Sequence, residues 1–567
     1  MNYNRGPSSV VLPLLIAFSA ASAYLTATSD LTYPSSSFVG SRTCAECHSS
    51  IYATFSTTPM ARSSGPINIV QEDLTENEFV HAKSGVRYRI LRDDHNGYLE
   101  FSRPRGHPEN RLPIQGLRRL DYFVGSGAVG RSYFFSLDGF LFQSPASYYS
   151  LRRKWDISPG YEHSETMDLT RPVEVDCLRC HAGQLQPVSG TQNRFQNPAF
   201  QENGIGCERC HGPGKLHVEQ LRSGIRSRER LVVNPAKLES KRRDSICAQC
   251  HLTGEVQVVK PGRSLRSFQP GDLLSDFAVS FVWDSAQERG LKVHSHYERL
   301  WQSECKKRSG DKLWCGSCHD PHAVPDKAGK QDYFRRKCMA CHRSSDCNAD
   351  SHLQRASKGD CIACHMPKND IVGIEHTVYT DHAIPRNQKK AQLVDSTQNL
   401  VLRPFADEDS SKRDLGLAYS KLAAKYPEQA YIDQAFQLLR QAVEEKAGDA
   451  ELFLHFGYLH QAIGSETKAV THYKQALELD STKLEAAVNL GAILAKGDDY
   501  SAAIRLWEDA LSRNPGIDAA RINLALAYLR QGDQSAGQKA ILRALEFQPD
   551  SSQTQKLLAE VGRKTIP

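Results

Sequence analysis

The C-terminal part of the chain shows a helical hydrophobic pattern that repeats every 34 residues. Small residues recur at this interval in two series, Gly457, Gly491 and Ala525, and Ala476, Ala510 and Ala544. Large apolar residues recur in a third series, Tyr473, Trp507 and Ile541. Small residues at fixed positions let helices cross closely, so the pattern predicts stacked helix pairs over 413–562. Within this range, Ala435, Leu439 and Ala442 mark an earlier, degenerate unit, and 552–562 predicts a capping helix.

Alternating apolar and polar residues form a second pattern between about 78 and 150. Val86–Ile90 and Tyr98–Phe101 alternate on either side of the turn sequence Asp93–Gly97. The same arrangement recurs where 131–136 and 140–143 flank a second turn. These patterns predict two β-hairpins in a small β-rich insertion. The G-x-G-x-x-G sequence at 125–130 precedes a strand-like segment instead of a helix, so we interpret it as a glycine-rich loop and not as a dinucleotide site.

The N-terminus carries a short apolar run, Val10–Phe18, which follows Arg5 and precedes Ala21-Ser22-Ala23. This order is typical of a secretory signal peptide, so we predict a signal peptide over 1–23 and a leader over 24–40. An uncleaved anchor helix is the alternative, although the run is shorter than the roughly 20 residues that span a bilayer. The predicted location is periplasmic or otherwise extracytoplasmic, with no membrane span after cleavage.

Composition restricts the class of protein. The 567 residues are 40% hydrophobic and 24% charged, which argues against a polytopic membrane protein and against a wholly disordered chain. A net charge of +6 lacks the dense basic stripe of a nucleic-acid binder, so no nucleic-acid partner is expected. A polar stretch without periodicity predicts a linker over 387–412.

The cysteines carry the chemistry, because 14 of the 16 lie in seven C-x-x-C-H sequences. Composition alone predicts roughly 0.02 such sequences, and this one is typical of c-type haem attachment. The attaching cysteines are Cys44, Cys47, Cys177, Cys180, Cys207, Cys210, Cys247, Cys250, Cys315, Cys318, Cys338, Cys341, Cys361 and Cys364. Two thiols at this spacing reach both vinyl groups of one haem, and the following histidine lies under the iron. The proximal ligands would be His48, His181, His211, His251, His319, His342 and His365. Zinc is a weaker alternative, since zinc ribbons do not need a histidine after each pair.

Seven haems c within 41–386 leave about 50 residues per haem, so the haems are expected to form much of the core. Basic residues between 222 and 243 are interpreted as counter-charge to haem propionates or as a docking patch for an acidic redox partner. The two remaining cysteines, Cys305 and Cys347, form either a disulfide or two unrelated thiols.

Two parts of the chain resemble known families. The 34-residue period matches the tetratricopeptide repeat. Residues 44–386 resemble the multihaem cytochromes c related to the cytochrome c554 domain, and look most like exported heptahaem cytochromes fused to such repeats. The sequences that carry the resemblance are Gly125–Gly127, Ser158–Tyr161, Cys207–Gly214 with His217, Cys315–His322, Cys361–Pro367 and His376–His382. The implied fold is mainly α: a haem-packed multihaem cytochrome c domain with a small β-rich insertion, followed by a tetratricopeptide-repeat α-solenoid.

Eleven histidines outside the motifs supply candidates for the distal iron positions: His81, His95, His107, His163, His217, His294, His296, His322, His352, His376 and His382. His217 and His322 follow their own motifs too closely to reach over the same haem, so each is expected to ligate a neighbouring one. The resemblance implies the same role for His376 or His382. Further distal candidates are His81, His163, His296 and Met60, of which Met60 is alternatively core packing. His95 lies in a predicted turn and is expected to be exposed.

Two functions remain open. The surplus of histidines permits every iron to be six-coordinate, and no C-x-x-C-K sequence, typical of pentahaem nitrite reductases, occurs. Both observations favour an electron carrier, and no catalytic residue is assigned. The alternative is a multihaem oxidoreductase that acts on a small nitrogen or sulfur oxyanion at a five-coordinate haem. The repeat domain is expected to dock a redox partner protein, with a polar column of His455, Asn489 and Asn523 on its concave side.

Overall fold

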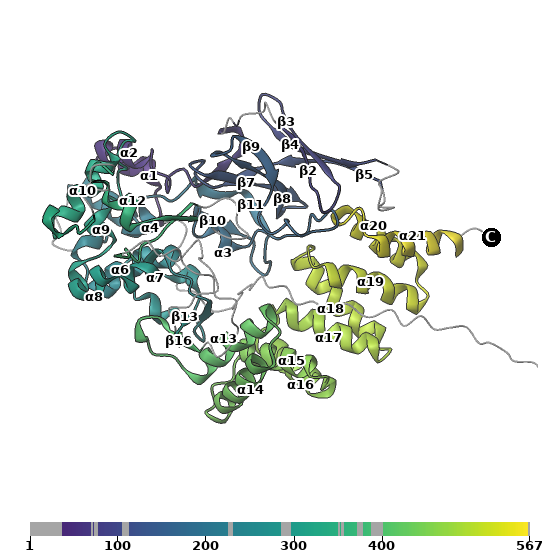
Figure 1. Ribbon diagram of the computed structural model, residues 1–567. Coiled ribbons are helices and arrows are strands. Elements are labelled where there is room, and N and C mark those ends of the chain that lie inside the picture. Colours follow the sequence, from purple (N-terminus) through teal and green to yellow (C-terminus); the bar gives the residue numbers. More distant parts are fainter. Residues whose placement is uncertain are drawn as a thin grey trace, which may run out of the picture. The chain divides into compact units, whose positions relative to one another are not determined.

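The computed structural model describes residues 37–69, 72, 77–104, 113–224, 231–284, 296–349, 352, 357–370, 378–386 and 401–564 (Figure 1). These residues divide into two compact units, 37–447 and 448–564. Several predicted features lie outside the described residues: the signal peptide, 24–36 of the leader, 387–400 of the linker, His107, His294 and His376.

Two antiparallel sheets dominate the segment between the first and second motifs. The five-stranded sheet has the order β1 (Ser64–Pro66), β6 (Tyr122–Val124), β7 (Gly130–Leu137), β8 (Phe140–Tyr149) and β9 (Lys154–Ile157). The four-stranded sheet has the order β2 (Glu78–Val80), β3 (Arg87–Arg92), β4 (Gly97–Arg103) and β5 (Ile114–Leu120). A separate hairpin, β10 (Gly183–Pro187) and β11 (Phe195–Glu202), follows the second motif. The β-rich part is therefore larger than the predicted insertion, and this unit is mixed rather than mainly α.

Both predicted hairpins are present. In the first, Ile90 of β3 lies opposite Leu99 of β4, and both side chains are buried. In the second, β7 pairs with β8 around the predicted turn. The glycine-rich loop lies between β6 and β7, where Gly125 has a φ of +105° and a Cβ atom on it would collide with the carbonyl oxygen of Gly130. Because a strand follows, the interpretation as a loop is confirmed.

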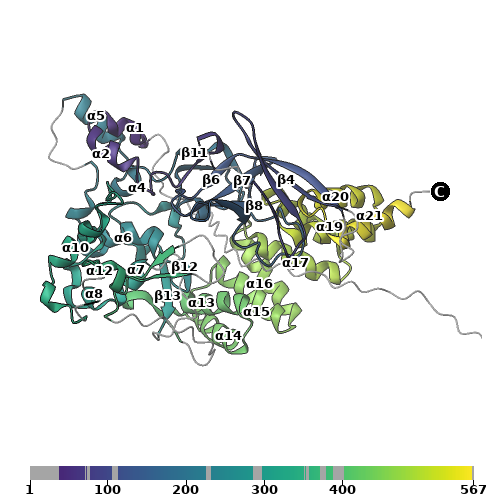
Figure 2. The ribbon, with the colours of Figure 1, turned by 45° about the horizontal axis from the view of Figure 1, so that its top comes forward.

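The motifs lie on short helices, most of which gather at one end of the first unit (Figures 1 and 2), whereas the helix of the second motif packs with Phe134 and Leu141 of the five-stranded sheet. These helices are α1 (Ser41–Ala45), α2 (Ser49–Phe55), α3 (Val175–Leu178), α4 (Glu208–His211), α5 (Lys215–Arg222), α6 (Ser240–His251), α7 (His296–Gln302), α8 (Glu304–Ser309), α9 (Cys315–Cys318), α10 (Lys330–Met339) and α12 (Cys361–His365). Single 3₁₀ turns cover Ile67–Ile69, Pro235–Lys237, Leu265–Ser267, Leu274–Asp276, Gly310–Lys312, Ser344–Asp346 and Phe405–Asp407. A short hairpin joins β14 (Lys368–Asp370) to β15 (Val378–Thr380).

The first helix pair of the C-terminal region belongs to the first unit. A sheet of β12 (Val256–Val259), β13 (Ala278–Trp283) and β16 (Leu402–Pro404) supports α13 (Lys412–Lys425) and α14 (Gln429–Glu444). The buried Arg413 guanidinium donates a hydrogen bond to the carbonyl of Val259 at 3.1 Å. The structure thus differs from the predicted domain boundary, because 401–412 contributes a strand and buried apolar residues, including Leu402, rather than a free linker.

The second unit is a stack of antiparallel helices. It contains α15 (Ala450–Ala462), α16 (Glu466–Leu479), α17 (Leu484–Lys496), α18 (Tyr500–Arg513), α19 (Asp518–Gln531), α20 (Gln534–Phe547) and α21 (Ser552–Lys564). A Cβ atom on Gly457 would lie 2.4 Å from the ring of Tyr473, and one on Gly491 would lie 2.7 Å from the indole of Trp507. The 34-residue register therefore pairs a small residue on one helix with a large ring on the next, as predicted.

The polar column of this unit is buried. The exposed fractions of His455, Asn489 and Asn523 are 6%, 0% and 1%, and the Asn489 amide donates to the hydroxyl of Tyr473 at 3.3 Å. These three side chains are therefore part of the packing between helices and do not form an exposed polar surface. Among the described residues, no helix is both long enough and apolar enough to cross a membrane.

Candidate functional site

The motifs adopt helical turns, in which the histidine follows the first cysteine by one turn. The backbone N–H of His48 donates to the carbonyl of Cys44 at 2.9 Å, and the N–H of His319 donates to Cys315 at 2.9 Å. This spacing of four residues is one helical turn. The two thiols and the imidazole of one motif are therefore presented on one side of the backbone, as attachment to a single haem requires.

Cysteines from different motifs meet in pairs. Thiols of different motifs lie close enough to shift each other's pKa in four pairs: Cys44 with Cys207, Cys180 with Cys250, Cys247 with Cys315, and Cys338 with Cys361. The neighbouring Cys44 thiol lowers the pKa of Cys207 to about 7, and the neighbouring Cys250 thiol lowers the pKa of Cys180 to about 6. The structure thus places the first motif beside the third, the second beside the fourth, the fourth beside the fifth, and the sixth beside the seventh.

Residues between the two cysteines of a motif form hydrogen bonds that connect the second, third and fourth motifs. The guanidinium of Arg179, in the second motif, donates to the carbonyl of Gln249, in the fourth, at 2.7 Å. Arg209, in the third motif, donates to the carbonyl of Arg179 at 2.8 Å. The residues that lie between the cysteines thus help to hold the attachment sites together. The motif pattern alone does not indicate this role.

Three predicted distal histidines lie beside proximal ones, and two of them, His296 and His382, also lie 4.9 Å from each other. Ring centroids lie 5.9 Å apart for His211 and His322, with an interplanar angle of 11°. They lie 6.2 Å apart for His319 and His382, and 5.3 Å apart for His251 and His296. An iron bound between two imidazole nitrogens at about 2 Å each separates the centroids by roughly 6 Å.

Backbone carbonyls orient several of these rings. The Nδ1 atom of His211 lies 2.7 Å from the carbonyl of Val233, and that of His382 lies 2.7 Å from the carbonyl of Thr380. The Nδ1 atom of His365 lies 3.0 Å from the carbonyl of Pro385. Donation from Nδ1–H fixes the tautomer and leaves Nε2 as the metal-binding nitrogen. The histidine sequence pattern contains no signal for these carbonyl partners.

Burial keeps three of the imidazoles in the form that binds a metal. It lowers the pKa of His211, His319 and His382, and a neighbouring histidine lowers the first two further. A lower pKa favours the neutral ring, which alone has a lone pair for iron.

Other distal candidates have different surroundings. Both ring nitrogens of His81 have partners in the β-rich part, the hydroxyl of Ser84 at 2.9 Å and the carbonyl of Glu162 at 3.3 Å. His81 is therefore a buried histidine whose two ring nitrogens are held by hydrogen bonds within the β-rich part, and its assignment as a distal ligand stays a prediction. His163 is exposed.

Three residues remain: the distal candidates His217 and Met60, and the turn histidine His95. His217 lies on α5, whose Arg222 forms a 2.7 Å ion pair with Glu46 of the first motif. Met60 is half-buried, and its carbonyl accepts hydrogen bonds from Ser63 and Ile205. His95 is exposed in the turn between β3 and β4, as expected.

The donor set fits haem c. The motifs supply two thiols for each attachment, and the paired histidines supply nitrogen ligands on both sides of an iron. Within the described parts of the chain, no group of three or more histidine, cysteine or acidic side chains is arranged to hold a metal ion. Cys305 and Cys347 are both described, and no disulfide joins them.

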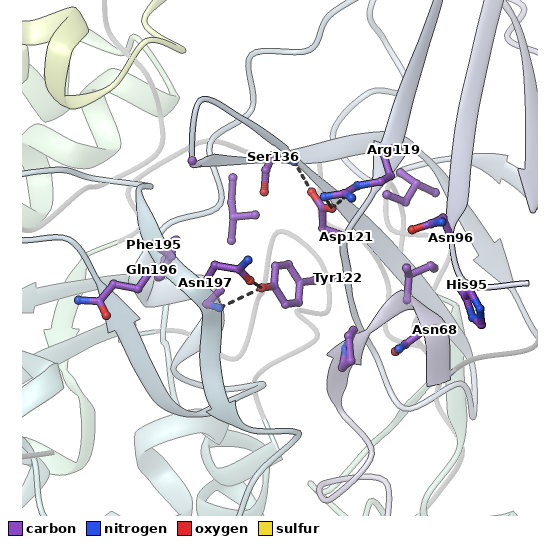
Figure 3. A pocket seen from close by; sticks show the side chains of 16 residues that line it. Asn68, His95, Asn96, Arg119, Asp121, Tyr122, Ser136, Phe195, Gln196 and Asn197 are labelled. Atoms are coloured by element: carbon purple, nitrogen blue, oxygen red, sulfur yellow. Dashed lines mark hydrogen bonds and ion pairs between the residues drawn. The ribbon is translucent and has the colours of Figure 1, made fainter. Parts of the chain in front are cut away.

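A cavity of about 380 Å³ lies apart from the motifs, among the strands of the β-rich part (Figure 3). Its wall includes an ion pair between Arg119 and Asp121 at 2.8 Å, and the hydroxyl of Tyr122 close to the amide of Asn197 at 3.4 Å. No cysteine lines this cavity. It is a separate feature from the attachment sites.

Comparison with known proteins agrees with this geometry. The family model "Cytochrome c554 and c-prime" matches residues 148–212, which contain the second and third motifs. A cytochrome c554 domain is present. The cytochrome c-554 of Nitrosomonas europaea is 26% identical over 187 residues, which cover 32% of this chain and 72% of that protein. The cytochrome c554 domain implies haem c as cofactor and suggests a haem electron carrier.

The second unit has its own relatives. Tetratricopeptide-repeat models match residues 450–483 and 494–561, so these repeats are present. The photosystem I assembly protein Ycf3 of Acaryochloris marina is 26% identical over 118 residues, covering 19% of this chain and 71% of that protein. A solved structure of MamA AMB-1 is 21% identical and covers 27% of this chain and 80% of its own, with a TM-score of 0.25. Tetratricopeptide repeats typically mediate protein–protein interaction.

Proposed function

We propose that this protein is an exported electron-transfer protein that binds seven haems c covalently and docks a redox partner through its tetratricopeptide repeats. The cytochrome c554 domain supports haem binding. The count of seven rests on the intact C-x-x-C-H sequences, and export rests on the N-terminal apolar run.

The observation that carries the proposal is the meeting of cysteines from different motifs. The thiols of Cys247 and Cys315, for example, are close enough to shift each other's pKa although 68 residues separate them in the chain. Haem c, when bound, supplies an iron that changes between ferric and ferrous states. The chain's part is to hold the attachment sites side by side and to orient the ligand imidazoles, so that neighbouring cofactors would lie close enough for electrons to pass between them.

Paired histidines favour transfer over catalysis. His322 and His382 each stand opposite a proximal histidine and would complete the coordination of its iron. An iron with two imidazole ligands offers no open position to a small oxyanion. The repeat unit, which contains no cysteine, then has a separate task in binding a protein partner.

Intact mass spectrometry tests the cofactor count and the cleavage together. Protein from a host that matures c-type cytochromes is expected to begin after Ala23 and to exceed its polypeptide mass by seven haems. A matched variant, Cys177→Ser with Cys180→Ser, is expected to lose one haem mass. Retention of all haems in this variant, or fewer than seven in the parent, would contradict the proposal. Catalytic reoxidation of the reduced protein by nitrite, hydroxylamine or tetrathionate would support the oxidoreductase instead.

A further inference from the structure

Helix α1, which carries the first attaching cysteine, is capped by carboxylates from elsewhere in the chain. Its own cap residue makes no side-chain hydrogen bond. Glu208 accepts from the backbone N–H of Val39 at 3.0 Å and of Gly40 at 2.9 Å. Glu202 accepts from the N–H of Ser41 at 2.9 Å. Two acidic side chains thus bind three consecutive N–H groups at the positive end of the helix.

Glu208 is the more deeply engaged of the two carboxylates. It also accepts from the backbone N–H of Gly214 at 2.7 Å and from the side-chain amide of Gln184 at 3.2 Å. The residue is 7% exposed. All four partners are neutral N–H groups, and among the described residues no lysine, arginine or histidine forms an ion pair with it. A buried carboxylate is therefore held by hydrogen bonds from neutral groups and by no ion pair among the described residues.

The position of this charge is specific. Glu208 lies between the two cysteines of the third motif, and Cys207 beside it lies next to the Cys44 thiol of the first motif. The hydroxyl of Ser41 also accepts from the N–H of Cys207 at 3.0 Å. The carboxylate therefore lies where the first and third attachment sites meet, 163 residues apart in sequence.

We propose that Glu208 is a positioning residue that fixes the first haem-attachment motif against the third, and that its charge lowers the reduction potentials of the two haems held there. The inference rests on the proposed function. A fixed negative charge in a medium of low dielectric constant stabilises the ferric form relative to the ferrous form, which carries one positive charge fewer. Buried charges are screened far less by salt than exposed ones.

The chain provides a matched control in Glu46. This residue also lies between the two cysteines of a motif, in the first attachment site. Its side chain, however, is 57% exposed and forms an ion pair with Arg222. Glu46→Gln removes the same charge from a comparable position, but one where water and a guanidinium already screen it.

Spectroelectrochemical titration of the haem-loaded protein tests the electrostatic part. Glu208→Gln is expected to raise the potentials of two of the haems, while Glu46→Gln shifts them by a smaller amount. A shift in Glu208→Gln that is absent, or no larger than that in Glu46→Gln, would overturn the role of the charge. Haem content measured by intact mass must be equal in the three proteins, so that the comparison reports potential and not occupancy.

Amide hydrogen exchange tests the positioning part without reference to the cofactor. Glu208→Gln keeps one carbonyl acceptor and is expected to speed exchange at Val39, Gly40 and Gly214. Glu202→Gln is expected to speed exchange at Ser41, and Glu46→Gln at none of these amides. Unchanged exchange in Glu208→Gln would refute the positioning role. A parent protein without haem would refute the proposed function, whereas this exchange pattern would still be measurable and would judge the positioning role by itself.

Discussion

His322→Ala is expected to remove the distal ligand from one iron in each molecule. The imidazole of His322 lies 5.9 Å from that of His211, nearly parallel to it, a separation close to the roughly 6 Å of two rings that share one iron. Its other ring neighbour is Phe55, which carries no ligand atom. The geometry therefore assigns His322 to a single proximal partner, and its loss is expected to open one position per molecule, one in seven of the proposed haems.

Carbon monoxide binding to the fully reduced protein measures this number. The variant is expected to bind one more equivalent than the parent and to gain one high-spin signal in the oxidised state, with every haem still attached because attachment depends on the cysteines. His95→Ala is the matched control, since that histidine is exposed in the turn between β3 and β4. Equal carbon monoxide stoichiometry in His322→Ala and the parent, at equal haem content, would refute the pairing.

Three further predictions concern stability. Trp507→Ala empties a fully buried site in the repeat unit and should cost about 3–5 kcal/mol in unfolding free energy, with Trp507→Phe costing less, as measured by urea denaturation followed by far-ultraviolet circular dichroism. The guanidinium of Arg413 lies 2.7 Å from the carboxylate of Asp414, so Arg413→Ala leaves this carboxylate buried without its cation and should lower the unfolding free energy of the first unit by about 3–5 kcal/mol. The control is Lys412→Ala, which removes an exposed ion pair and should cost under about 1 kcal/mol. Equal effects of the two substitutions would contradict the argument. Burial lowers the pKa of His460 from 6.5 to about 4, so the folded state resists protonation of this ring. The stability that depends on the neutral ring is complete above pH 6.5 and is lost as the pH falls towards 4. His460→Gln should therefore make the melting temperature of the repeat helices less dependent on pH between 6.5 and 4.

Features that depend on short stretches of chain could be predicted from the sequence. The hairpin of β3 and β4 follows from alternation around a turn only a few residues long. The helical turn of each motif follows from a spacing of four residues, and the contact of Gly491 with Trp507 follows from a repeated pair 16 residues apart. In each case the interacting residues are close in sequence, so their order already limits their geometry.

The arrangement of the motifs relative to one another was decided only by the tertiary structure. His322 lies beside His211 across 111 residues, and nothing in the spacing of either distinguishes that partner from the proximal histidines of the five other motifs that remained open to His322. The sequence could not indicate the hydrogen-bond partners of His81 either, because one of them is a carbonyl 81 residues away. Backbone carbonyls and amides are present at every residue, so a sequence cannot mark which of them will orient an imidazole or bind Glu208. Composition and spacing therefore determined the chemistry of this protein, while long-range packing decided which groups share a site.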